Sequence, residues 1–145
     1  MPGREQGLQR FIDAVEAGIR ARAADFPDAM SMVDRIFSAL ENAGEVNTEN
    51  TPTRLETCRH LENAYDQARK GPEPFPELTD AFAALEPKFA WNRRAEAATV
   101  AGDFYDNHTN AMIVGNGGLE TRQDVVIGVS LVAPGITYPR HHHPP

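Results

Sequence analysis

The chain has 145 residues, a length that suits one domain with its own apolar core. Its formal net charge of −7 offers no basic surface to nucleic acid or to an anionic membrane, so we expect a small-molecule or protein partner. The single Cys58 excludes an intramolecular disulfide, and no apolar segment could export the chain or span a bilayer, which predicts a soluble cytoplasmic protein.

The first half of the chain is predicted to be helical, because its apolar residues recur at spacings of three and four. Four amphipathic helices are expected, over residues 8–26, 28–44, 51–69 and 77–85. Asp28 and Thr51 are the expected N-caps, and Gly44 is expected to end the second helix. The prolines of 71–76 form a stiff connector before the fourth helix.

Beyond Trp91 the pattern becomes that of β-strands. The apolar "AMIVG" of 111–115 leads into a glycine-rich turn, and the continuous β-branched run of 124–135 predicts a buried strand. The segment 136–143, "ITYPRHHH", is predicted to be the next strand. The sequence therefore predicts an α+β fold, with an N-terminal helical region over 1–95 and the first strands of a sandwich or barrel over 96–145.

Three consecutive histidines stand near the end of the chain. On a strand, His141 and His143 would point to the same face and could bind one metal ion, while His142 would point away. Neutral imidazole is a common ligand of zinc, iron, copper and nickel. A purification tag or a solvated tail is the alternative, but tags are usually longer runs. We therefore predict that His141 and His143 are metal ligands.

The spacing before the histidines resembles a known motif. From Gly135 onward the chain has the pattern G-x5-H-x-H, which is the first half of the first cupin motif. Cupins are small antiparallel β-barrels that hold a metal. With "NAMIVGNGG" at 110–118 and "WNRR" at 91–94, the chain resembles the cupin-type dimethylsulfoniopropionate (DMSP) lyase family. Because the motif's glutamate and the second motif are not among the 145 residues, the resemblance implies a barrel truncated within the first motif.

The resemblance implies a function and a set of site residues. The family cleaves DMSP to dimethyl sulfide and acrylate by β-elimination, with a divalent metal that we expect to be zinc or iron. It implies His141 and His143 as metal ligands, Tyr138 and His141 as substrate-binding residues, and Tyr138 as the candidate catalytic residue. Since the further ligands of the family lie outside these residues, we expect weak metal affinity and little activity from this polypeptide.

Two other functions stay open. One is a cupin relative with other chemistry, or a metal-free sensor, because a fold does not determine a reaction. The other is a helical dimerisation or interaction module that forms a homodimer without metal. Dimer formation in the absence of metal would favour the second.

Several other residues have both a structural and a functional interpretation. His60 and His108 could supply further ligands, although a helix edge and a polar loop are expected for them. Phe104, Tyr105 and Trp91 are expected to be core or hinge aromatics, with an aromatic box for a sulfonium cation as the alternative. Cys58 is expected to be a core thiol, with a nucleophile as the alternative. Arg93 and Arg94 are expected to be surface charges, with contacts to a substrate carboxylate as the alternative.

Overall fold

The computed structural model describes residues 3–99 and 102–143. Its helices within these residues are α1 Gln6–Ala23, α2 Pro27–Leu40, α3 Leu61–Arg69 and α4 Phe75–Leu85, with 3-10 turns η1 Glu56–His60, η2 Glu86–Lys88, η3 Ala95–Thr99 and η4 Tyr105–Asn107. Its strands are β1 Glu45–Val46, β2 His108–Val114, β3 Glu120–Thr121 and β4 Ile127–Val132. The predicted α+β class is confirmed, and the helices precede the strands except for the short β1, which lies between α2 and α3.

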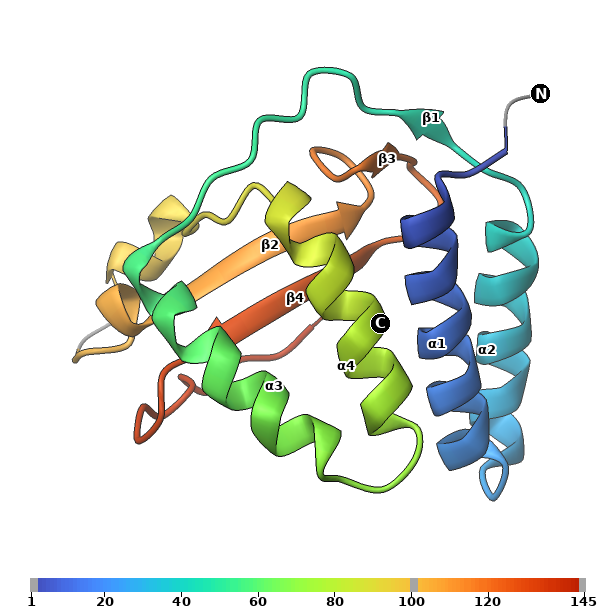
Figure 1. Ribbon diagram of the computed structural model, residues 1–145, viewed down its shortest axis with the longest axis horizontal. Coiled ribbons are helices and arrows are strands. Elements are labelled where there is room, and N and C mark those ends of the chain that lie inside the picture. Colours follow the sequence, from blue (N-terminus) through green and yellow to red (C-terminus); the bar gives the residue numbers. More distant parts are fainter. Residues whose placement is uncertain (1–2, 100–101, 144–145) are drawn as a thin grey trace.

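The four strands form one mixed sheet in the order β1-β3-β2-β4. The long pair is antiparallel, from His108 opposite Val132 to Val114 opposite Ile127, with an irregularity between Met112 and Val114. Strand β3 pairs with β2 in parallel and with β1 in antiparallel fashion. Figure 1 shows α4 crossing in front of β2 and β4, with α1 and α2 side by side next to it. Helix α4 therefore lies across one face of the sheet, α1 packs on α4, and α2 packs on α1.

Helices and sheet share a single apolar core. Phe82 of α4 lies among three other rings, at centroid distances of 6.0 Å from Phe11, 6.1 Å from Tyr65 and 5.5 Å from Phe89. The same buried cluster includes Ile113 of β2. Because α1, α3, α4 and the sheet contribute to this core, burial of these side chains stabilises both halves of the chain together.

Two predicted N-caps are wrong. Helix α2 begins at Pro27, whose fixed φ suits the first helical position, so Asp28 lies in the first turn and Phe26 occupies the cap. Thr51 does not begin a helix, because the neighbouring Thr53 forms a β-bridge with Ala90. Apart from the bridge at Thr53, residues 51–55 have no regular secondary structure, and the helical turn starts only at Glu56 after an extended Leu55.

Other boundaries also differ from the prediction. Helix α2 ends at Leu40, before Gly44, and α4 already begins at Phe75, inside the predicted connector. Gly44 approaches β3 so closely that a Cβ there would lie 2.7 Å from the carbonyl oxygen of Thr121. A glycine is therefore needed at position 44 because the loop packs closely on the sheet, and it does not end the helix.

The predicted strands past Trp91 are confirmed in part. Both β2 and β4 form, but β4 is the edge of the described sheet and Val126 beside it is 65% exposed, so the prediction of a fully buried strand is wrong. The segment 136–143 is not a strand either. After a turn in which the amide of Ile136 donates to Ala133, it runs back beside the sheet as coil (Figure 1). Pro139 has no amide hydrogen, which disfavours a strand ladder there.

None of the helices in the described residues is both long and apolar enough to cross a lipid bilayer. The division of the chain at residue 95 into a helical region and a barrel region stays a prediction.

Candidate functional site

The three predicted site residues lie next to one another in the coil that follows β4. The ring centroids of Tyr138 and His141 are 4.7 Å apart, and those of His141 and His143 are 5.0 Å apart. All three side chains are exposed, and Tyr138 is 45% exposed. The structure therefore brings the predicted residues together, although the strand that was expected to align them does not form.

Hydrogen bonding determines which nitrogen of His141 is free. Its Nδ1 lies 2.8 Å from the carbonyl oxygen of Pro139. Because a carbonyl oxygen only accepts, Nδ1 carries the proton of this bond, and in the neutral ring Nε2 keeps its lone pair. That lone pair is the one a metal or a substrate proton would meet.

The described residues do not complete a metal site. Across 3–99 and 102–143 no three His, Cys, Asp or Glu side chains gather where they could hold one ion. His141 and His143 supply two imidazoles, whereas a catalytic zinc needs about three protein ligands. The two imidazoles are chemically suited to zinc or iron, but on their own they are one ligand short.

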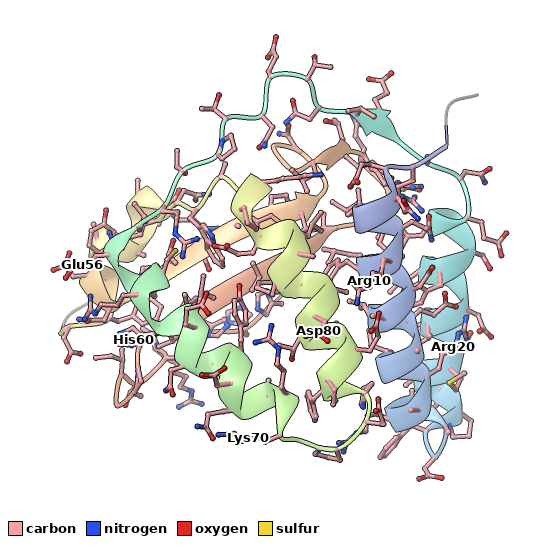
Figure 2. The ribbon with its side chains drawn as sticks, viewed as in Figure 1. Arg10, Arg20, Glu56, His60, Lys70 and Asp80 are labelled. Atoms are coloured by element: carbon pink, nitrogen blue, oxygen red, sulfur yellow. The ribbon has the colours of Figure 1, made fainter. Side chains whose placement is uncertain are left out.

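The two other histidines lie elsewhere. His108, at the start of β2, is 2% exposed, and its Nδ1 lies 2.9 Å from the carbonyl oxygen of Phe104. His60 lies where η1 meets α3 (Figure 2). Its Nε2 is buried without a hydrogen-bond partner in the described part of the chain. Neither joins His141 and His143 in a group of three.

Phe104, for which the sequence suggests an aromatic box only as the alternative to a core or hinge role, is in contact with Tyr138. The ring of Phe104 meets that of Tyr138 edge to face at 4.9 Å and stacks on His108 at 4.1 Å. Trp91 has a different place, since its Nε1 donates to Glu86 in the buried core at 2.9 Å. Residue type was the only sequence indication for Phe104, because contacts between distant segments have no local pattern.

Arg93 has a structural role that neither interpretation anticipated. It is half-buried, and it donates to the carbonyl oxygens of His108 and Asp106, both at 2.9 Å, and to Thr57 Oγ1 at 3.3 Å. Its guanidinium also lies 5.7 Å from the ring centre of Tyr105. Arg93 therefore fixes the turn that carries Phe104.

The remaining candidate, Cys58, is buried among apolar residues, as the sequence predicts. Burial raises the pKa of its thiol. A thiol that stays protonated is a poor nucleophile, so Cys58 is a core residue.

Comparison with known proteins gives a consistent family assignment. A family model described as dimethylsulfoniopropionate lyase matches residues 29–145, which include Tyr138, His141 and His143. A search of curated protein sequences finds no match.

One solved structure also resembles the chain. It comes from the work titled "Crystal structures of DMSP lyases RdDddP and RnDddQII", with a TM-score of 0.52 and 17% sequence identity. The match covers 86% of this chain and 57% of the other, so this chain spans little more than half the length of that protein. At this identity the likeness shows the fold. Because the family model matches far more than half of the residues, the chain belongs to the dimethylsulfoniopropionate lyase family.

Proposed function

We propose that this chain contributes to the cleavage of DMSP into dimethyl sulfide and acrylate. The observation that carries the proposal is the family match, which runs through the segment where the rings of Tyr138, His141 and His143 lie in succession. The exposure of all three leaves them accessible to a small molecule.

The proposed reaction is a β-elimination. A base removes the proton on the carbon beside the carboxylate, and the electron pair of that C–H bond forms the new carbon–carbon double bond. The carbon–sulfur bond breaks, and its electrons leave with sulfur as neutral dimethyl sulfide. The products are acrylate and the protonated base, so atoms and charge balance.

Each predicted site residue has a proposed role in this scheme. Tyr138 contacts the substrate and is the candidate catalytic residue at its reacting carbon, and the exposed ring can also lie against the sulfonium group. His141 contacts the substrate. His141 and His143 each bind a divalent metal, zinc or iron, through a nitrogen lone pair of the imidazole ring. When bound, such a metal would act as a Lewis acid on the carboxylate.

A metal titration tests the histidine roles. Calorimetric titration of zinc into the 145-residue polypeptide should show weak binding that His141→Ala and His143→Ala abolish. The matched control is His142→Ala, which should keep the affinity within about twofold. Equal losses in all three variants would mean that the histidines bind as an unstructured run, like a tag, and would contradict the proposal.

An activity assay tests the reaction. With two of about three required ligands, we expect this polypeptide to release dimethyl sulfide from DMSP slowly or not at all, as measured by gas chromatography. Any release that occurs should fall in Tyr138→Phe and His141→Ala. Stoichiometric zinc or iron retained through gel filtration, together with rapid release, would overturn the expectation of weak affinity and low activity.

A further inference from the structure

The segment 136–143 has few specific attachments to the rest of the molecule. Its described hydrogen bonds, Ile136 to Ala133 and His141 to Pro139, both lie within the coil after β4. Among the hydrogen bonds, ion pairs and ring contacts of the described residues, the one that joins this segment to another element is the contact of Tyr138 with Phe104. The position of Tyr138 therefore depends on where Phe104 is held.

Phe104 itself is held firmly. Its ring is 6% exposed and lies nearly parallel to His108, at an interplanar angle of 14°. Its carbonyl oxygen accepts from the amide of Asn107 at 3.1 Å and lies 2.9 Å from Nδ1 of His108. Both the ring and the backbone of Phe104 are thus fixed to the start of β2.

The start of β2 is in turn anchored to the sheet and the helices. His108 lies opposite Val132 of β4, and its carbonyl oxygen accepts from Arg93 Nε at 2.9 Å and from Thr57 Oγ1 at 3.4 Å. Thr57 lies on η1, so strand and helical region meet at this point. A continuous series of contacts therefore links Thr57 and Arg93 to His108 and His108 to Phe104. Phe104 in turn contacts Tyr138 of the site segment.

From this arrangement we propose that Phe104 is a positioning residue. Its ring, fixed on His108, holds Tyr138, and through the ring of Tyr138 it holds His141. The role of Tyr138 and His141 in chemistry rests on the proposed function, whereas the mechanical coupling does not. A group held by a rigid neighbour loses less entropy when it binds a ligand.

The test is Phe104→Leu in the 145-residue polypeptide, because leucine keeps an apolar side chain in the buried site but removes the ring. Backbone ¹⁵N relaxation should show lower order parameters at the amides of Tyr138, Arg140 and His141, with those of Ala111 and Ile113 in β2 unchanged. The matched control is Phe26→Leu, at a phenylalanine that is 64% exposed before α2, which should change neither region. Unchanged order at the amides of Tyr138, Arg140 and His141 in Phe104→Leu would overturn the inference.

A second variant covers the case in which Phe104→Leu does not fold. Tyr138→Leu removes the other ring of the same contact from an exposed position, and it should lower the order of residues 140 and 141. Folding is checked by circular dichroism. If the order of these residues does not fall, the coupling through Tyr138 is refuted.

Zinc affinity separately tests whether the positioning by Phe104 affects metal binding by His141 and His143. Phe104→Leu should bind zinc about threefold to tenfold more weakly than the unmodified polypeptide, because the segment must then be ordered on binding. If the unmodified polypeptide binds no zinc, the proposed metal role of His141 and His143 fails, while the relaxation experiment still decides the positioning role.

Discussion

Two regions of the molecule are held by different interactions: ion pairs and hydrogen bonds hold the buried charges around Glu120, and ring contacts hold the exposed segment around Tyr138. The side chains of Arg4, Glu120 and Arg122 are 3%, 4% and 9% exposed, and Glu120 accepts from both arginines and from the amide of Gly44 at 2.8 Å. The segment of Tyr138 has no ion pair in the described residues and is held by ring contacts. The carboxylate of Glu120 has its hydrogen-bonding capacity filled, which is typical of a structural role. The Nε2 of His141 keeps a free lone pair that can bind a metal or accept a proton.

The Glu120 cluster joins three parts of the chain that are far apart in the sequence. Arg4 precedes α1, Gly44 follows α2 and Glu120 begins β3. Arg122 also donates to the carbonyl oxygens of Asn42 and Ala39, at 2.6 and 2.8 Å. Loss of the carboxylate would leave the buried guanidinium of Arg4 without its ion-pair partner, whereas Arg122 would keep Asp124 at 2.8 Å.

The largest expected effect is therefore that of Glu120→Ala. Removing one partner of a buried ion pair costs about 3–5 kcal/mol. The free energy of unfolding, measured in urea, should fall by this amount. In contrast, His141→Ala at the exposed site should change it by less than about 0.5 kcal/mol. A loss in His141→Ala as large as in Glu120→Ala would remove the contrast between the two regions.

The pH dependence should sharpen the same contrast. Burial would raise the pKa of Glu120, but hydrogen bonds from Arg4 and from the Gly44 amide outweigh it and hold the pKa below its ordinary value of 4.5. A lowered folded-state pKa adds stability that is fully present above the unfolded value and is lost as pH falls through the folded value. Unfolding free energies between pH 6 and about pH 3 should therefore fall more steeply in the unmodified chain than in Glu120→Gln. Parallel curves would show that Glu120 does not carry the dependence.

The smallest expected effect concerns a buried hydroxyl that has no partner. Tyr65 is 7% exposed, its Oη has no hydrogen-bond partner in the described residues, and burial raises its pKa, which keeps the hydroxyl neutral. Tyr65→Phe should leave the free energy of unfolding unchanged or raise it by up to about 1 kcal/mol. The matched control is Tyr138→Phe at an exposed ring, which should be neutral. A clear loss in Tyr65→Phe would mean that the hydroxyl binds a buried water.

Local patterns in the sequence were enough for the long elements and for the family. Apolar spacing predicted α1 to α4, the β-branched runs predicted β2 and β4, and the G-x5-H-x-H spacing from Gly135 led to the family that the comparison confirms. Each of these features depends on residues that are close together in the chain. Sequence alone therefore determined the four α-helices, the two long strands β2 and β4, and the family to which the chain belongs.

Only the tertiary structure decided how these segments meet. The extended backbone at Thr53, the edge position of β4, the ion pair of Arg4 with Glu120 and the contact of Phe104 with Tyr138 all depend on partners far away in the chain. Such pairings follow from which surfaces can be buried together, and this competition overrides local preference. The periodicity of apolar residues predicts which residues face the core, but which residues contact one another depends on how the whole core packs.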